Sequence, residues 1–390
     1  MYSIKTLNPI AAIGTDGFDR TKYSITDNAV NPDAVLVRSA SMHNQDFNPE
    51  LIAIARAGAG VNNIPVDKCS EEGICVFNTP GANANAVKEL VLAGLLLSSR
   101  RIPDSLEWVK TIKEEGDSIP ALVEKGKGQF TGPEITGKTL GVIGLGAIGA
   151  IVANAAIALG MNVVGTDPFL SVNAALRLSP KVQVVPSNDD VFAAADYISV
   201  HVPFNADTEG FINADTVAKM KDGVRILNFA RGELVNDGDM LNALENGKVA
   251  CYVTDFPNAN IVGKNGVVAI PHLGASTPES EDNCAVMAVA QLIDYLENGN
   301  IMNSVNLPNA SMVAHGTKVC IIHKNVPKII ASVTTVIADA GHNIENMVNA
   351  SRKNYAYTML DVTDGVNGSL VEAIKAVNGV IRVRVIRNCQ

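Results

Sequence analysis

The sequence predicts an α/β protein with two doubly wound parallel-sheet domains and a smaller α+β domain at the C-terminal end. Three observations lead to this prediction. Short apolar runs alternate with helical stretches in the first hundred residues, the same alternation restarts at Thr139, and residues 318–387 follow a βαββαβ order. Strands that are apolar along their whole length are typical of parallel sheets covered on both faces.

The first predicted sheet takes its strands from apolar runs at 34–37, 51–55 and 74–77. Each run ends in a loop of small or polar residues, and such loops commonly carry binding groups. A long helix is expected over residues 84–99, with an interruption at Pro103, because proline cannot sit in the interior of a helix without breaking it.

The second predicted sheet has strands separated by helices, as in a doubly wound fold. These strands are expected at residues 140–143, 162–166, 197–200, 225–228, 250–253 and 267–270. A polar segment at 303–316 contains Pro308 and shows no periodicity, so it is predicted to be a linker.

Composition limits the classes of partner. Of the 390 residues, 47% are hydrophobic and 18% are charged, which excludes a disordered chain. A formal net charge of −9 argues against nucleic acid or an acidic membrane as the main partner. The N-terminus lacks the apolar core of a signal peptide, and the apolar stretch at 90–98 is too short to cross a bilayer. A cytoplasmic location is therefore expected.

The cysteines are scattered and form no CxxC pair, so the sequence indicates neither a zinc site nor a disulfide framework. No metal is expected. The six cysteines are Cys69, Cys75, Cys251, Cys284, Cys320 and Cys389.

A glycine-rich turn, Gly144-Leu-Gly146-Ala147-Ile148-Gly149, follows a predicted strand and opens an apolar helix. The first glycine permits the tight turn, the second lets the backbone approach a pyrophosphate, and the third packs the helix against the strand. The N–H groups of the helix N-terminus then face the phosphates. Asp167 ends the next predicted strand, where its carboxylate would bind the ribose hydroxyls and repel a 2′-phosphate. The sequence thus predicts NAD binding, and the alternative for Asp167 is a turn residue before Pro168.

Two cationic side chains follow strands of the second predicted sheet. Arg231 lies after the strand at 225–228, and His272 follows the strand at 267–270. A 2-hydroxy acid dehydrogenase needs a base for the hydroxyl proton, for which histidine is suited by its pKa near neutrality. It also needs a cation for the carboxylate, which the arginine fork binds bidentately. Considered singly, a surface ion-pair arginine and a strand-end histidine are the better explanations.

Together, the segments 144–149, 201–208, 228–232 and 271–276 resemble the D-2-hydroxyacid dehydrogenase family. The resemblance implies two Rossmann-like domains, with the NAD-binding domain inserted into a discontinuous substrate-binding domain. The implied bounds are 1–92 with 282–305 for the substrate-binding domain, 93–281 for the NAD-binding domain, 306–316 for the linker and 317–390 for the C-terminal domain.

The resemblance also implies roles for single residues. Arg231 would hold the substrate carboxylate, and His272 would be the general acid and base. Backbone N–H groups of Gly58, Ala59 and Gly60 would face the substrate carboxylate. The residues that would line the cofactor, besides the glycine-rich turn and Asp167, are His201, Thr208, Ala230 and Asp255.

One departure from the family pattern concerns the partner of the histidine. The family places a glutamate shortly after the Asp-x-Phe-Pro segment, where it holds the histidine tautomer. Here Asp255-Phe-Pro-Asn-Ala-Asn260 is followed by Ile261, so no carboxylate stands at that place. An imidazolium without such a partner is less stabilised. The candidates for a substitute are Asp255, Glu279 and Glu281.

Two arginines follow adjacent strands of the first predicted sheet, Arg38 and Arg56. Guanidinium groups match phosphate oxygens, so these side chains are candidates for binding a phosphorylated substrate. Exposed ion pairs are the alternative, and Lys125 and Lys127 are weaker candidates for added positive charge.

The C-terminal segment resembles an ACT regulatory domain, on the residues 319–327 and 341–344. That resemblance implies a serine effector site with His323, Asn325 and Asn343, whereas a purely dimerising ACT fold is the alternative. Core and tail together imply oxidation of 3-phospho-D-glycerate, the entry to L-serine synthesis, by a homodimer or homotetramer associated through helices at 84–99 and 151–159. A reductase for glyoxylate or 2-oxoglutarate, or a non-catalytic NAD(H)-sensing protein, stays open.

Overall fold

The structure is a computed structural model that describes residues 1–363 and 365–387. Its chain forms two compact units. The terminal unit comprises Met1–Asn83 and Pro278–Gln390, and the central unit comprises Ala84–Thr277. The predicted fold class is confirmed, because two parallel sheets are followed by an antiparallel βαββαβ segment.

The terminal unit begins with a five-stranded parallel sheet in the order β2-β1-β3-β4-β5. Its strands are β1 (Tyr2–Thr6), β2 (Tyr23–Thr26), β3 (Ala34–Val37), β4 (Ala53–Arg56) and β5 (Cys75–Phe77). Three of these were expected from the sequence, whereas β1 and β2 were not. The reason is that both are short and carry polar residues between their apolar ones, which weakens the strand signal.

Helices α1 (Ala12–Thr15), α2 (Val66–Glu71) and α11 (Pro278–Asn298) accompany this sheet. The long helix α11 packs on α1 and on β4, and it buries Leu292, Tyr295 and Leu296 in the core of the unit. The chain enters this helix directly from the central unit, whose last residue is Thr277.

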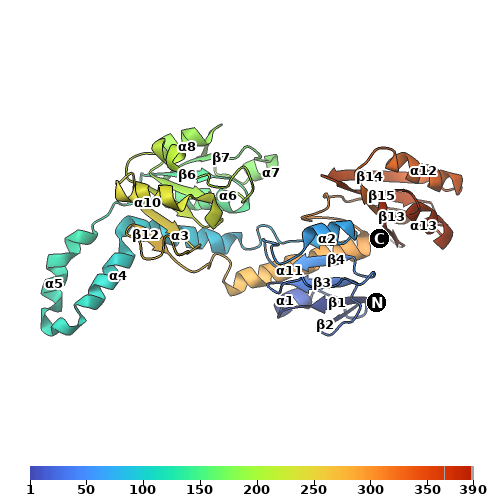
Figure 1. The fold of residues 1–390 in the computed structure, drawn as a ribbon, viewed down its shortest axis with the longest axis horizontal. Coiled ribbons are helices and arrows are strands. Elements are labelled where there is room, and N and C mark those ends of the chain that lie inside the picture. The colour runs from blue at the N-terminus through green and yellow to red at the C-terminus, as the bar shows by residue number, and fades with distance from the viewer. Residues whose placement is uncertain (364, 388–390) are drawn as a thin grey trace. The chain divides into compact units, whose positions relative to one another are not determined.

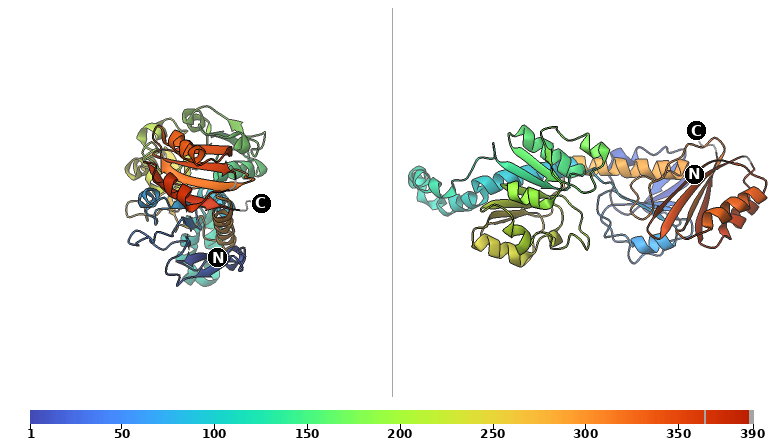
Figure 2. Two further views of the ribbon diagram at one scale, coloured as in Figure 1. Left: turned by 90° about the vertical axis from the view of Figure 1, so that its right-hand side faces the viewer. Right: turned by 90° about the horizontal axis from the view of Figure 1, so that it is seen from above.

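The C-terminal part of the terminal unit is a four-stranded antiparallel sheet in the order β14-β15-β13-β16. Two helices cover one face of the sheet (Figure 2), where they share a core with Val319 and Ile321. The opposite face, with Ile322 and Tyr357, belongs to the same core as helix α11. The elements are β13 (Thr317–Lys324), α12 (Ile329–Asp339), β14 (Ile344–Arg352), β15 (Tyr355–Val362), α13 (Gly368–Lys375) and β16 (Val380–Ile386).

Three side chains of this sheet bind the C-terminal end of α11. Arg384 donates to the carbonyl oxygens of Tyr295 and Leu296, at 3.2 and 3.0 Å. The Lys318 Nζ donates to the Asn298 carbonyl at 2.7 Å, and the Tyr357 hydroxyl donates to that of Gly299 at 2.7 Å. The last carbonyls of a helix have no hydrogen-bond partner within the helix, and they form the negative end of the helix dipole. Lys318 and Arg384 donate hydrogen bonds to such carbonyls and bring positive charge to the negative end of the dipole. We call Lys318, Tyr357 and Arg384 the helix clasp.

The predicted linker forms no helix or strand, yet it is not loosely attached. Leu307, Ala310, Met312 and Ala314 are buried in the core of the terminal unit, and Ala310 forms a bridge with Ile301. Residues 306–316 thus join the parallel sheet to the antiparallel one through packed side chains.

The central unit contains a seven-stranded parallel sheet in the order β12-β11-β10-β9-β6-β7-β8. The sequence anticipated all strands except β8, which has two exposed residues. The strands are β6 (Thr139–Ile143), β7 (Asn162–Thr166), β8 (Gln183–Val184), β9 (Tyr197–Val200), β10 (Val224–Asn228), β11 (Val249–Thr254) and β12 (Val267–Ala269).

Helices lie on both faces of this sheet, as expected for a doubly wound fold (Figure 1). They are α3 (Ala84–Arg100), α6 (Ala147–Ala158), α7 (Val172–Ala175), α8 (Asn188–Ala194), α9 (Ala214–Ala218) and α10 (Asp237–Glu245), with the 3-10 turn η3 (Gly232–Leu234). Helices α3 and α6 pack on each other, and Val91, Leu95, Val152 and Ala153 belong to one core.

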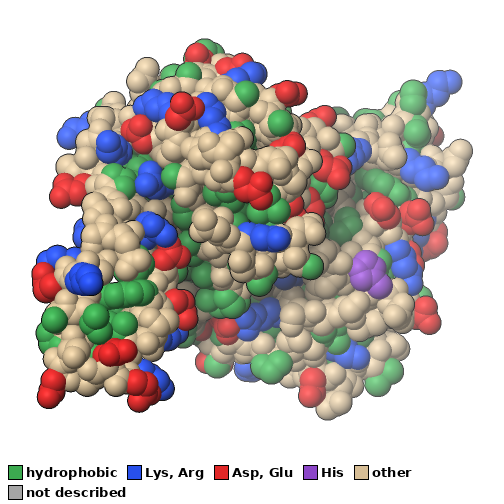
Figure 3. Space-filling model, turned by 60° about the vertical axis from the view of Figure 1, so that its left-hand side comes forward, with side chains coloured by type: hydrophobic (Ala, Val, Ile, Leu, Met, Phe, Trp, Pro, Cys, Tyr) green, Lys and Arg blue, Asp and Glu red, His purple; other side chains and the backbone are tan. Residues whose placement is uncertain are grey.

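Residues 102–130 form a helical arm that projects from the rest of the central unit (Figure 1). It consists of α4 (Ile102–Thr111), η1 (Lys113–Ser118), α5 (Ile119–Gly126) and η2 (Lys127–Phe130). None of these four helices has a buried residue, and hydrophobic side chains gather on the surface of the arm (Figure 3). The Trp108 ring packs on Phe130, with centroids 5.4 Å apart.

Among the described residues, five cysteines are buried and none forms a disulfide, whereas Cys389 lies outside those residues. Within the described part of the chain, no helix is both long enough and apolar enough to cross a membrane.

Candidate active site

The loops at the carboxyl ends of the central sheet carry most of the residues that the sequence singles out. Open parallel sheets bind their ligands at this edge. The glycine-rich turn follows β6, Asp167 follows β7, His201 follows β9, Arg231 follows β10, and Asp255 follows β11.

Glycines shape the turn between β6 and α6. Gly144 has a φ of 91°, and a Cβ there would lie 2.8 Å from the His201 carbonyl oxygen. A Cβ on Gly149 would lie 1.9 Å from the carbonyl oxygen of Gly144. Gly146 is the N-cap of α6 and makes no side-chain cap. Apart from its neighbours along the chain, no atom of the described residues lies within 4 Å of the position that a Cβ on Gly146 would take. The N–H groups of Ala147 and Ile148, in the first turn of α6, are thus beside open space that an anionic group can enter.

Asp167 is tied to the same turn. Its Oδ2 accepts a hydrogen bond from the Leu145 N–H at 2.9 Å, and its Oδ1 accepts one from the Phe169 N–H at 2.8 Å. Each carboxylate oxygen has a further lone pair, so the ribose hydroxyls of a dinucleotide can bind without displacing these contacts.

His201 and Thr208 belong to the loop after β9. The His201 Nε2 lies 2.8 Å from the Ser199 hydroxyl, and burial lowers the pKa of His201 to about 4. This imidazole is therefore neutral near pH 7. The Thr208 hydroxyl donates to the Pro203 carbonyl at 2.7 Å and accepts from the Asn205 N–H at 2.9 Å, which fixes the shape of the loop.

The Arg231 side chain projects from a turn that a buried asparagine builds. The Asn228 side chain donates to the Arg231 carbonyl at 2.7 Å and accepts from the Ala230 N–H at 3.2 Å. Arg231 itself is exposed, and its Nη1 donates to the Ala230 carbonyl at 2.6 Å. Because the backbone is fixed by Asn228, the guanidinium is held at the edge of the sheet.

His272 lies beside a cavity of about 480 Å³ whose lining includes Gly232, Glu233, Asp255 and Phe256. Its ring contacts the Phe256 ring, with centroids 4.7 Å apart. Asp255 is fully buried, and its Oδ2 accepts a hydrogen bond from the Gly274 N–H at 3.2 Å. The loop that carries His272 is therefore anchored on Asp255.

Two opposing effects act on the Asp255 carboxyl. Burial raises its pKa above the ordinary value, while the positive charges of His272 and Arg231 lower it. Of the carboxylates considered as substitutes for the family glutamate, Asp255 is the one on which the His272 charge acts. Glu279 is exposed, and Glu281 forms an ion pair with Arg38 in the terminal unit.

These residues fit an NAD molecule. The Asp255 Oδ1 is buried and has no hydrogen-bond partner among the residues that the structure describes. Buried polar atoms normally have a partner, and the amide of a nicotinamide offers the N–H donors that this oxygen lacks. The open helix N-terminus at Gly146 and the carboxylate of Asp167 suit the pyrophosphate and a ribose.

In the terminal unit, Arg38 follows strand β3, and Arg56 is the last residue of the adjacent strand β4. The Arg56 Nε donates to the Arg38 carbonyl at 3.0 Å. A Cβ on Gly58 would lie 2.5 Å from the Arg56 Nη1, so this guanidinium lies directly over the glycine-rich loop. The carbonyl of Ala59 accepts from the Asn78 side chain at 2.6 Å, and Gly60 is half-buried.

The three candidate effector residues do not converge within one chain. His323 pairs with Ala356 at one end of β15, whereas Asn343 bonds Thr363, beyond the other end. His323 is 3% exposed, and its ring nitrogens lie 2.8 Å from the Lys324 carbonyl and 2.9 Å from the Thr358 hydroxyl. Asn325 is exposed, and its side chain donates to the Lys353 carbonyl at 3.0 Å.

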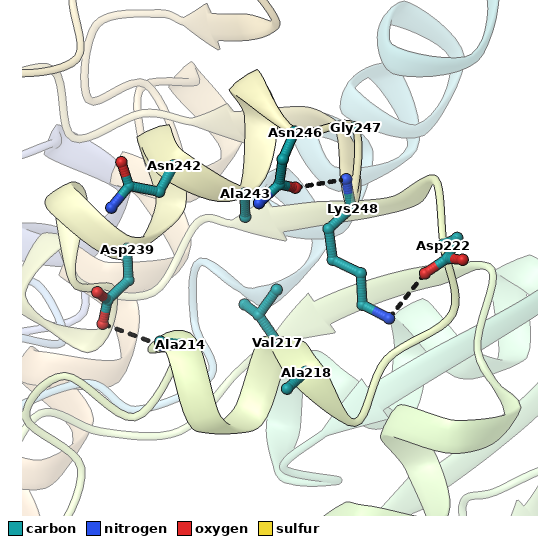
Figure 4. Close-up of a pocket in the computed structure, with 10 residues that line it drawn as sticks. All are labelled: Ala214, Val217, Ala218, Asp222, Asp239, Asn242, Ala243, Asn246, Gly247 and Lys248. Atoms are coloured by element: carbon teal, nitrogen blue, oxygen red, sulfur yellow. Dashed lines mark hydrogen bonds and ion pairs between the residues drawn. The ribbon is translucent and has the colours of Figure 1, made fainter.

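A larger cavity of about 620 Å³ lies between α9 and α10 (Figure 4). Its rim includes Asp222 and Lys248, which precede β10 and β11 and form an ion pair of 2.9 Å. The cavity runs along these two helices, and His272 is not among the residues that line it. Among the described residues, no cluster of three or more His, Cys, Asp or Glu side chains could hold a metal ion.

Two supporting residues were missed at the level of sequence. The Asn8 Oδ1 accepts hydrogen bonds from the N–H groups of Arg38, Ser39 and Ala40, at 3.1, 3.0 and 2.9 Å. Asn8 follows β1, a strand that was not expected, so its place at the carboxyl edge could not be foreseen. Asn228 is the last residue of an expected strand. This position at the carboxyl edge of the sheet was the one feature of the sequence that could have indicated its role in holding the Arg231 turn.

Residues 92–274 match the model of the D-isomer specific 2-hydroxyacid dehydrogenase NAD binding domain. A D-3-phosphoglycerate dehydrogenase of Bacillus subtilis (strain 168) is 36% identical over 291 residues, which is 71% of this chain and 52% of that protein. A D-3-phosphoglycerate dehydrogenase of Synechocystis is 35% identical over 297 residues, 74% of this chain and 51% of the relative. The chain thus spans about half the length of the curated relatives that it matches.

A solved structure of NAD⁺-bound 3-phosphoglycerate dehydrogenase from Entamoeba histolytica has a similar fold. It has a TM-score of 0.59 and 24% identity, and the match covers 80% of this chain and 99% of the other. At this level of identity the likeness concerns the fold.

Proposed function

Because the chain contains the NAD-binding domain of the D-isomer specific 2-hydroxyacid dehydrogenases, we propose that it is an NAD-dependent dehydrogenase that oxidises a D-2-hydroxy acid to the 2-oxo acid. The proposal rests on one observation: Arg231, His272 and the buried Asp255 lie at the same edge of the central sheet. The positive charges of His272 and Arg231 both act to lower the pKa of the Asp255 carboxyl. The curated relatives named above suggest 3-phospho-D-glycerate as the acid and 3-phosphohydroxypyruvate as the product, the first step of L-serine biosynthesis.

In this proposal His272 accepts the proton of the substrate hydroxyl, and Arg231 holds the carboxylate and stabilises the forming carbonyl. The bound nicotinamide supplies the hydride acceptor. Asp255 positions the His272 loop by accepting the hydrogen bond of the Gly274 N–H. Asn228 keeps Arg231 at the sheet edge through two backbone contacts.

The phosphorylated substrate is supported by the terminal unit. Arg38 follows β3, Arg56 ends the neighbouring strand β4, and Arg56 lies over the loop of Gly58. Guanidinium forks and backbone N–H groups at strand ends suit the oxygens of a phosphate or a carboxylate. We assign these residues to the binding of the anionic groups of the substrate.

Serine regulation through the C-terminal sheet belongs to the same proposal. Strand β14 is an edge strand with mostly exposed side chains. Antiparallel pairing of two β14 strands in a dimer would bring Asn343 of one chain toward the His323 end of the other. A serine site built from His323, Asn325 and Asn343 therefore requires two chains.

The arm offers a second surface for association. Leu106 and Val109 on α4 are 58% and 48% exposed. Helices α3 and α6, which were expected to associate with another chain, contribute many of their apolar residues to the core of their own unit. We therefore propose that the arm contributes to a homodimer or homotetramer, because apolar patches of this kind are typical of interfaces.

The test of the proposed reaction is NADH formation from 3-phospho-D-glycerate by the full chain. Arg231→Ala and His272→Ala should each lower kcat/KM at least about a hundredfold, as expected for loss of a charge-stabilising group or a general base. The exposed Arg177 and His315 provide matched controls, and their alanine variants should keep full activity. Full activity of either site variant would contradict the assignment.

A further inference from the structure

The Arg38 side chain already has an anionic partner in the chain itself. Its Nη2 lies 2.5 Å from the Glu281 Oε1, and the two side chains are 41% and 42% exposed. Both residues belong to the terminal unit, Arg38 after β3 and Glu281 in the first turn of α11. The Arg38 guanidinium, which we assign to substrate binding, is therefore paired with the Glu281 carboxylate when no substrate is bound.

The surroundings hold both partners in place. Three N–H groups of the Arg38 loop bond the Asn8 side chain, and the Arg38 carbonyl accepts from Arg56. On the other side, the first turn of a helix is the place where a carboxylate is stabilised by the helix dipole. The backbone segments that carry Arg38 and Glu281 are thus both held in place by other contacts. The two side chains are nevertheless exposed enough for a ligand to reach them.

An exposed ion pair of this kind contributes little stability, typically below about 1 kcal/mol. A ligand with an anionic group at its far end can therefore take the place of Glu281 on Arg38 at a small cost. A 2-hydroxy acid without such a group leaves the pair intact, and Arg38 is not left as an unpaired charge. The energetic cost of displacement thus falls only on ligands that carry a distal anion.

We propose that Glu281 is a specificity-determining residue that competes with the distal anion of the substrate for Arg38. The inference rests on the proposed function, since it assumes that the substrate has such an anion. It makes Glu281 a residue that weakens the binding of phosphorylated acids and leaves the binding of acids with no distal anion unchanged.

Glu281→Gln removes the charge and keeps the shape of the side chain. In the reduction direction, its KM for 3-phosphohydroxypyruvate should fall about threefold, the size expected for an exposed pair, while its KM for glyoxylate stays unchanged. Asp282→Asn removes the same charge from the same helix turn and is the matched control, for which both KM values should stay as in the wild type. A Glu281→Gln variant with unchanged KM values, or with equal changes for both substrates, would overturn the proposal.

A binding measurement separates this inference from the proposed reaction. Inorganic phosphate is titrated calorimetrically into the full chain at saturating NAD⁺, so that the turn at Gly144–Gly149 is not available to it. Glu281→Gln should bind phosphate about threefold more tightly than the wild type, and Arg38→Gln should lose this binding. If the wild type does not turn over phosphorylated acids but this order of affinities holds, the proposed substrate fails and the role of Glu281 stands. Equal phosphate affinity of wild type and Glu281→Gln would refute the role of Glu281 even in an active enzyme.

Discussion

The Asp255 carboxyl is fully buried, its Oδ1 has no hydrogen-bond partner in the part of the chain that the structure describes, and the charges of His272 and Arg231 act on it. Burial raises its pKa, so the folded chain binds this proton more tightly than the unfolded chain does. Stability from this group is therefore present at low pH and is lost as the pH rises through the raised pKa. The protein keeps a carboxylate that costs stability near neutral pH, which is common for groups retained for function.

Asp255→Asn keeps the shape of the side chain and removes the charge. At about pH 7 the variant should unfold at a Tm about 2–4 °C above that of the wild type, the shift that corresponds to roughly 1 kcal/mol. Its dehydrogenase activity should fall at the same time. Near pH 3 the difference in Tm should vanish because both states are then protonated. Thermal unfolding across this pH range checks the prediction, and a lower Tm of the variant at neutral pH would contradict it.

His201 acts in the opposite direction on acid stability. Burial lowers its pKa to about 4, so between that pH and the ordinary value of 6.5 the unfolded chain binds a proton that the folded chain does not. Stability is thus lost as the pH falls through this window. In His201→Asn the fall in Tm between these two pH values should be smaller by about 2–4 °C or more. An identical pH dependence of Tm in both proteins would show that His201 does not contribute.

At the scale of elements, helix α11 links the features of the terminal unit. Its first turn carries Glu281 of the Arg38 ion pair, and its last turn is held by the helix clasp. Arg384 also lies over the Tyr295 ring, 4.4 Å from its centroid. The antiparallel sheet is thereby fixed to the same helix that carries Glu281, the ion-pair partner of Arg38.

Arg384→Met removes one of the two cations of the clasp and replaces it with an apolar side chain. It should lower the free energy of unfolding by about 2–3 kcal/mol, because two hydrogen bonds from a charged group are lost. The control is Arg20→Ala, since the contacts of Arg20 with Asp16 and with the Thr15 carbonyl are exposed, and its effect should stay within about 0.5 kcal/mol. Urea unfolding of both variants measures the difference, and equal stabilities would rule out the clasp as a stabilising contact.

The arm is the second element with a distinct expectation. Leu106→Asp combined with Val109→Asp places charges on its exposed apolar face. Because a charge is costly to bury in an interface, the double variant should sediment as a smaller species than the wild type while its far-UV circular dichroism stays the same. Unchanged sedimentation would exclude this face from the association.

At the scale of the whole molecule, local patterns in the sequence were sufficient to predict much of the fold. The glycines of the 144–149 turn and the apolar strands around them predicted the central sheet, since turn chemistry and strand pattern are local properties. Strands β1 and β2 were missed because their apolar residues alternate with polar ones over short lengths.

Contacts between distant parts of the chain could not be predicted in this way. The pair of Arg38 with Glu281 and the clasp of Arg384 on Tyr295 join residues that are far apart in sequence. Nothing in the local pattern of either residue identifies the other. The exposure of the apolar residues on the arm could likewise not be predicted from the sequence, because it depends on which faces of α4 and α5 other elements cover.

The reduction of 3-phosphohydroxypyruvate by NADH, compared with that of glyoxylate and 2-oxoglutarate, tests the central claim most directly. The 390-residue chain should turn over the phosphorylated acid with the highest kcat/KM, and His272→Ala should abolish turnover of all three acids. A higher kcat/KM for glyoxylate or 2-oxoglutarate, or no turnover of any of the three despite tight binding of NADH, would contradict the account.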